Sequence, residues 1–154
     1  MEDAGRVLAV CVGAGGLPNH EVEWALASEH GVEGDRQRMR FHGGPDRAVC
    51  IFAAEDARAL EALGVEPLAP GAVGENLRTE GLDYTRLSPG DRLAVGDDVL
   101  LEIFDVREPC ATLQPLDARF PALMVGRSGF VCRVLRGGEL RPRQEIRRVD
   151  PTLA

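Results

Sequence analysis

The sequence contains no lysine, so arginine supplies all 18 of its basic side chains, against 25 Asp and Glu residues and a net charge of −7. Without a lysine amine, the chain cannot carry out Schiff-base chemistry. The negative charge argues against a general nucleic-acid binder, because phosphate backbones are bound through positive charge. Any side-chain cation that binds an anion here is a histidine or a guanidinium, and a guanidinium offers oxyanions a planar pair of donors.

The sequence also lacks an apolar run of about 20 residues, so we expect no membrane-spanning helix. The N-terminal run 7–12 is too short for a signal peptide and follows acidic residues. The four cysteines form no Cys-x-x-Cys pair, which disfavours a zinc site. With only three histidines, a histidine metal triad is also disfavoured. We therefore expect a cytoplasmic protein with reduced thiols, bound neither to membranes nor to nucleic acid.

Glycine and proline are abundant, with 18 and 10 residues, and they separate short β-prone runs. Residues 92–95 and 99–106 should form a hairpin around Gly96-Asp97-Asp98. The other runs expected as strands are residues 6–12, 48–53, 130–135 and 145–149. Short strands alternating with turns predict a barrel or sandwich, mainly β with a few helices. The length suits one domain spanning residues 1–154.

Helical patterns are few. Residues 54–63 carry apolar side chains three apart and end before Gly64, which predicts a helix. Residues 21–30 fit either a helix or a strand, because their apolar side chains alternate. A short helix near residues 116–124 would be interrupted by Pro121.

Several turns contain residue types that are suited to binding anions. Glycine pairs let backbone N–H groups converge on a ligand, and in residues 34–36 and 42–47 the side chains of Arg36, His42 and Arg47 add donors. Two further glycine-rich segments are residues 70–77 and 126–130. For each segment the alternative is a plain turn with solvated charges.

Cys110 stands out among the cysteines. Pro109 cannot donate to a ladder, so the strand before it should end there and leave Cys110 on a loop close to Arg107. A nearby cation favours the thiolate, the form that binds soft metals or attacks an electrophile. The alternative is that Cys110 is a small apolar filler. The other three cysteines fit that role better, because they lie within apolar strand patterns: Cys11, Cys50 and Cys132.

In their order along the chain, these segments resemble the MOSC family, named after the C-terminal domain of molybdenum cofactor sulfurases. The resemblance covers residues 6–149 and is greatest to small stand-alone members. Its motifs are residues 31–36, 42–49, 70–77, 81–82, 89–92, 107–110 and 126–135.

The resemblance implies a MOSC-type β-barrel with a cleft for the molybdopterin form of molybdenum cofactor. It implies that Cys110 is the molybdenum ligand or a sulfur carrier. Thr112 departs from the family pattern, since many relatives have a basic residue there. The other residues implied to bind the cofactor are Arg36, His42, Asp46 and Asn76 in the pocket, with Arg107 and Arg127 as anion partners.

Three functions stay open at this point. The chain could be a molybdenum-dependent enzyme that reduces N-hydroxylated compounds with electrons from a redox partner. It could instead be a carrier or sulfur transferase, in which Cys110 holds a persulfide or delivers cofactor to a molybdoenzyme. It could also be an anion-binding module without metal. The sequence leaves the substrate, the electron donor and the oligomeric state open.

Overall fold

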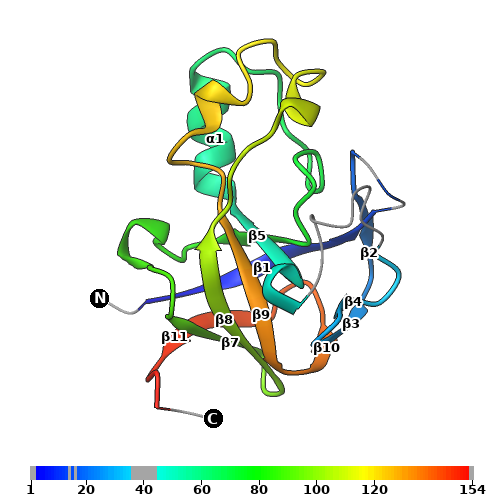
Figure 1. Ribbon diagram of the computed structural model, residues 1–154, viewed down its shortest axis with the longest axis vertical. Helices are drawn as coiled ribbons and strands as arrows, with labels where there is room; N and C mark the ends of the chain where they lie inside the picture. Colours follow the sequence, from blue (N-terminus) through cyan, green and yellow to red (C-terminus); the bar gives the residue numbers. More distant parts are fainter. Residues whose placement is uncertain (1–2, 14, 16, 36–44, 153–154) are drawn as a thin grey trace.

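The computed structural model describes residues 3–13, 15, 17–35 and 45–152. These residues form a mainly β fold around a closed barrel of seven strands (Figure 1). In order around the barrel, the strands are β11 (Glu145–Val149), β7 (Arg92–Val95), β8 (Val99–Val106), β9 (Phe130–Arg136), β5 (Val49–Ala53), β6 (Leu77–Glu80) and β1 (Ala4–Val12). The barrel closes because β1 pairs with β6 and also with β11.

The pair β5 and β6 runs parallel, which requires a crossover connection. Helix α1 (Ala54–Ala62) and residues 63–76 supply this crossover. The helix predicted for residues 54–63 is therefore confirmed, and so is the hairpin of β7 and β8. Figure 1 shows that α1 and the yellow segment before β9 lie together beyond one end of the barrel.

A small second sheet packs beside the barrel. It consists of β10 (Gly138–Leu140), β3 (Ala25–Ser28) and β4 (Gly31–Val32), while β2 (His20–Val22) extends the barrel sheet from β1. Residues 21–30 thus form strands, the second of the two alternatives. Their alternation places Ala25 and Ala27 inside and leaves Trp24 and Leu26 52% and 42% exposed.

Within the described ranges, the remaining helical elements are single 3₁₀ turns: η2 (Pro45–Arg47), η3 (Tyr84–Arg86), η4 (Ala111–Leu113) and η5 (Ala122–Met124). The helix expected near residues 116–124 is reduced to η5, which begins only after Pro121. No helix among the described residues is long and apolar enough to cross a membrane.

Two apolar clusters use opposite faces of β5. Val49 and Ile51 point into the barrel, whereas Phe52 packs outside it in a second cluster with α1. Because side chains alternate along a strand, Cys50 points out of the barrel as well. This outer face of β5 is the floor on which the functional cleft is built.

Candidate functional site

A cleft of about 830 Å³ opens outside the barrel, beside the carboxyl end of β8. Four segments and Val131 line it: residues 17–19, 47–50, 67–76 and 107–116. Much of the wall is apolar, and it includes the proline side chains Pro18, Pro67, Pro70, Pro109 and Pro115. Apolar walls with a few polar groups are typical of small-molecule sites.

Cys110 lines this cleft and is half-buried. β8 ends at Val106 and η4 begins at Ala111, so Cys110 lies on irregular backbone between them. Its Sγ atom lies 2.7 Å from the hydroxyl oxygen of Thr112, which also lines the cleft. The thiol therefore faces an open cavity and has a polar neighbour, which distinguishes it from an apolar filler.

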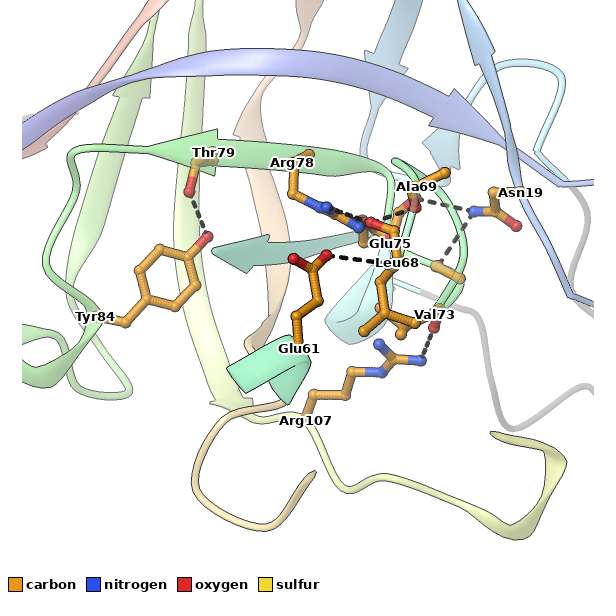
Figure 2. A network of polar contacts seen from close by, with 11 residues as sticks. Asn19, Glu61, Leu68, Ala69, Val73, Glu75, Arg78, Thr79, Tyr84 and Arg107 are labelled. Atoms are coloured by element: carbon orange, nitrogen blue, oxygen red, sulfur yellow. Dashed lines mark hydrogen bonds and ion pairs between the residues drawn. The ribbon is translucent and has the colours of Figure 1, made fainter. Parts of the chain in front are cut away.

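Arg107 connects the two sides of the cleft. Its backbone N–H donates to the carbonyl of Gly129 at 3.0 Å, and its own carbonyl accepts from the hydroxyl of Ser128. One guanidinium nitrogen, Nη2, donates to the carbonyl of Val73 across the cleft (Figure 2). The other, Nη1, is buried without a hydrogen-bond partner among the described residues. A buried donor in this state is unfavourable until an acceptor reaches it.

The wall formed by residues 67–76 is held by a buried ion pair. Glu75 is completely buried, and its Oε2 accepts from Nε of Arg78 at 2.7 Å. Arg78 also donates to the carbonyls of Leu68 and Ala69, both at 3.0 Å, and its guanidinium lies over the ring of Phe52. Figure 2 shows these contacts converging on one loop, so the ion pair fixes the shape of the cleft wall.

Asn76 lines the cleft, but the hydrogen bonds of its side-chain amide go to other groups of the protein. Its Oδ1 accepts from the backbone N–H of Cys50 at 2.9 Å, and its Nδ2 donates to the Cys11 carbonyl and to Asp35. Asp35 accepts from the backbone N–H of Gly13 as well. Burial raises the pKa of the Asp35 carboxyl, while these two hydrogen bonds act to lower it. Asn76 therefore joins three segments at the floor of the cleft.

Two further residues line the cleft: Arg47, expected from the sequence only as an anion donor in residues 42–47, and Cys50, expected as an apolar filler. Arg47 ends η2, is half-buried, and makes no hydrogen bond or ion pair with the described residues. Cys50 is half-buried on β5; burial raises the pKa of its thiol, whereas the charges of Arg107 and Arg47 act to lower it. The cleft thus brings two guanidinium groups and two thiols together.

Asp46 and Arg127, also expected at the site, do not line this cleft. Asp46 is exposed, and its carboxylate pairs with Nε of Arg133 at 2.6 Å. Arg127 precedes β9 and does not line the cleft; its charge partly offsets the burial that raises the pKa of Asp56. Arg36 and His42 lie outside the described residues.

The part of the chain that the structure describes contains no cluster of three or more His, Cys, Asp or Glu side chains able to hold a metal ion. A metal centre in this cleft would therefore need ligands beyond those of the described side chains. A single thiolate with ligands supplied by a cofactor meets that requirement.

Comparison with known proteins extends these observations. A model of the MOSC domain family matches residues 38–147. The uncharacterized protein YflK of Bacillus subtilis is 36% identical over 115 residues, which are 71% of this chain and 52% of YflK. A Gibberella moniliformis protein named "Reductase" is 35% identical over 125 residues, 75% of this chain but 22% of that protein. The chain thus spans about half the length of the first relative and less than a quarter of the second.

The fold also has a counterpart among solved structures. The crystal structure of YiiM from Geobacillus stearothermophilus superimposes with a TM-score of 0.80 at 24% identity, covering 95% of this chain and 75% of that one. The mainly β barrel expected from the sequence is confirmed by this likeness together with the strand order.

Proposed function

The chain belongs to the MOSC domain family, and from this we propose that its cleft binds the molybdopterin form of molybdenum cofactor, with Cys110 as the molybdenum ligand. The reaction we propose is the reduction of N-hydroxylated compounds. The observation that carries the proposal is the joint placement of the Cys110 thiol with Arg47 and Arg107 in one cleft. A thiolate suits a soft metal, and guanidinium groups suit a phosphate.

The residues present fit such a cofactor. A volume of about 830 Å³ is in the range of sites for small molecules and cofactors. Arg47 has no partner among the described residues, and Nη1 of Arg107 is a buried donor without an acceptor. Both groups would gain hydrogen bonds from a phosphate, and the proline faces would cover a flat ring system.

When bound, the cofactor supplies two-electron chemistry at molybdenum. The chain's own residues would bind and orient the cofactor: Cys110 would supply the sulfur ligand, and the Thr112 hydroxyl lies 2.7 Å from its Sγ atom. Arg107 is fixed through its backbone and through Val73, so its side chain is positioned before a ligand arrives.

Reduction of a hydroxylamine to an amine consumes two electrons and two protons and releases water, so a separate redox partner is required. The name of the Gibberella relative supports a reductase. The four free cysteines of the chain agree with the reducing cytoplasm that we propose as its location.

The first test is molybdenum content after expression in a host that makes the cofactor. The wild type and Cys132→Ser, a control in the barrel interior, should retain molybdenum, and Cys110→Ser should lose most of it. If the wild type and Cys110→Ser are both metal-free, or retain equal amounts, the ligand assignment is wrong. Circular dichroism checks that each variant is folded.

A second assay separates the enzyme from the carrier. The loaded protein is given a hydroxylamino substrate and an artificial electron donor, and formation of the amine is measured. Bound cofactor without turnover would eliminate the reductase and leave the carrier, in which Cys110 holds sulfur or delivers cofactor. The presence of a second thiol, Cys50, in the same cleft favours sulfur transfer as that alternative.

A further inference from the structure

The cleft holds two thiols that reach it from different parts of the fold. Cys50 extends from the outer face of β5, and Cys110 comes from the irregular segment after β8. Neither of the other cysteines lines the cleft: Cys11 and Cys132 are completely buried, and Cys132 belongs to the barrel interior. The two buried cysteines can therefore serve as controls for substitutions of the two cysteines in the cleft.

Unlike a cysteine in an apolar core, Cys50 has charged side chains close enough to affect its pKa. Arg107 and Arg47 act to stabilise its thiolate, whereas Glu75 and Asp35 act against it. Burial raises the pKa of the Cys50 thiol, and the charges of Arg107 and Arg47 lower it in part. A thiol attacks another sulfur as its thiolate, so the two guanidinium groups that favour the Cys50 thiolate would assist such an attack.

We propose that Cys50 is a resolving thiol, which releases sulfide from a persulfide carried on Cys110. The inference rests on the carrier alternative of the proposed function, in which Cys110 holds sulfur. It concerns the sulfur chemistry of the cleft, and it does not require molybdenum to be bound.

The chemistry has two steps. A low-molecular-weight persulfide first transfers its outer sulfur to Cys110, which forms Cys110–S–SH and leaves the donor as a thiol. The Cys50 sulfur then attacks Sγ of Cys110, and the bond from Sγ to the outer sulfur breaks. The outer sulfur leaves as sulfide, taking up the Cys50 proton, and a Cys50–Cys110 disulfide remains. The outer sulfur is reduced while the two thiols are oxidised, and a dithiol reductant restores them.

The backbone gives the two thiols different roles. Cys50 is fixed, because its N–H donates to Asn76 and its strand pairs with β9. Cys110 lies on irregular backbone between the end of β8 and the start of η4, and its carbonyl accepts one turn hydrogen bond, from the N–H of Leu113 at 3.1 Å. A disulfide needs Cα atoms about 5.5–6 Å apart, so the proposed cross-link requires the irregular segment with Cys110 to bring its thiol within that distance of Cys50.

The test uses the reduced full-length chain and glutathione persulfide as the sulfur donor. The loaded protein is desalted, the sulfide that it releases is measured over time, and disulfides are mapped by mass spectrometry without reduction. Four variants accompany the wild type: Cys50→Ser, Cys50→Ala, Cys110→Ser and the control Cys132→Ser.

The wild type and Cys132→Ser should release roughly one equivalent of sulfide and gain a Cys50–Cys110 cross-link. Both Cys50 variants should load persulfide on Cys110 and release sulfide at least about tenfold more slowly. Release at the wild-type rate from the Cys50 variants, or a cross-link from Cys110 to another cysteine, would overturn the proposal.

The sulfur step and the cofactor assignment can fail separately. Retention of molybdenum by Cys110→Ser would refute the metal-ligand role while leaving the sulfide measurement intact. Loading on Cys110 without release of sulfide would refute the resolving role of Cys50, whatever the molybdenum content.

Discussion

Replacing Arg78 by methionine should destabilise the protein more than any exposed arginine substitution. Arg78 is 4% exposed and its partner Glu75 is completely buried, so the variant leaves a carboxylate buried without its cation. Removing one partner of a buried ion pair typically costs about 3–5 kcal/mol. The carbonyls of Leu68 and Ala69 also lose their donors, which places the expected loss towards the upper end.

A loss of this size is a large part of a typical stability of about 5–15 kcal/mol. It corresponds to a decrease in Tm of about 6–20 °C for a chain of this length. Urea unfolding followed by circular dichroism measures it, with Arg119→Met as the control because Arg119 forms an exposed pair with Asp117. That control should lose less than about 1 kcal/mol.

A double variant identifies the cause of the loss. Glu75→Met together with Arg78→Met removes both charges and should recover at least half of the stability lost in Arg78→Met, since an apolar pair of similar volume is often tolerated. A loss below about 1 kcal/mol in Arg78→Met, or a double variant no more stable than the single one, would refute the account of the ion pair as the support of the cleft wall.

Three further predictions concern the rest of the fold. Gly129→Ala should lose about 1–3 kcal/mol more than Gly126→Ala in urea unfolding. Both glycines have positive φ, but a Cβ at Gly129 would lie 1.9 Å from a backbone carbonyl of β5, whereas a Cβ at Gly126 would meet nothing within 4 Å. Equal losses would contradict this reasoning. Unfolding stability should fall above about pH 9, because burial raises the pKa of Cys11 from 9.0 to about 12 and raises that of Cys132 as well. Above that pH the unfolded chain releases thiol protons that the folded chain keeps. The resulting loss of stability is absent below the unfolded pKa and grows by up to about 1.4 kcal/mol per pH unit and thiol. Burial raises the pKa of Cys50 and of Tyr84 as well, so both add to the loss, and Cys132→Ala should flatten the slope in urea titrations under reducing conditions. Asp46→Asn should change stability by less than about 1 kcal/mol, because its ion pair is exposed, and should leave molybdenum content unchanged; a metal-free variant would place Asp46 at the cofactor after all.

Much of the barrel could be predicted because its strands carry local patterns. The hairpin of β7 and β8 has apolar residues on both sides of a glycine–aspartate turn, and the structure has the same strand bounds. β6 was not predicted, because three of the four residues in its sequence, Leu-Arg-Thr-Glu, are polar. Its Arg78 is buried only because Glu75 and two carbonyls from the preceding loop surround it, and sequence spacing does not reveal such contacts.

The candidate site was predictable in part for a similar reason. Cys110 follows a proline that ends a strand, which is a local signal for an accessible thiol. Cys50 lies within a continuous apolar run, because both faces of β5 are covered by apolar clusters. Such a run lacks the alternation of apolar and polar residues that would indicate which side chains point out of the barrel. The cleft position of Cys50 therefore depends on how α1 and the loops fold over the barrel.

The measurement that tests the central claim most directly is a crystal structure of the chain purified with bound cofactor. The account predicts that Sγ of Cys110 is bonded to molybdenum and that the cofactor phosphate contacts Arg47 or Arg107. Molybdenum without a protein thiolate ligand, or a cofactor bound outside this cleft, would contradict it.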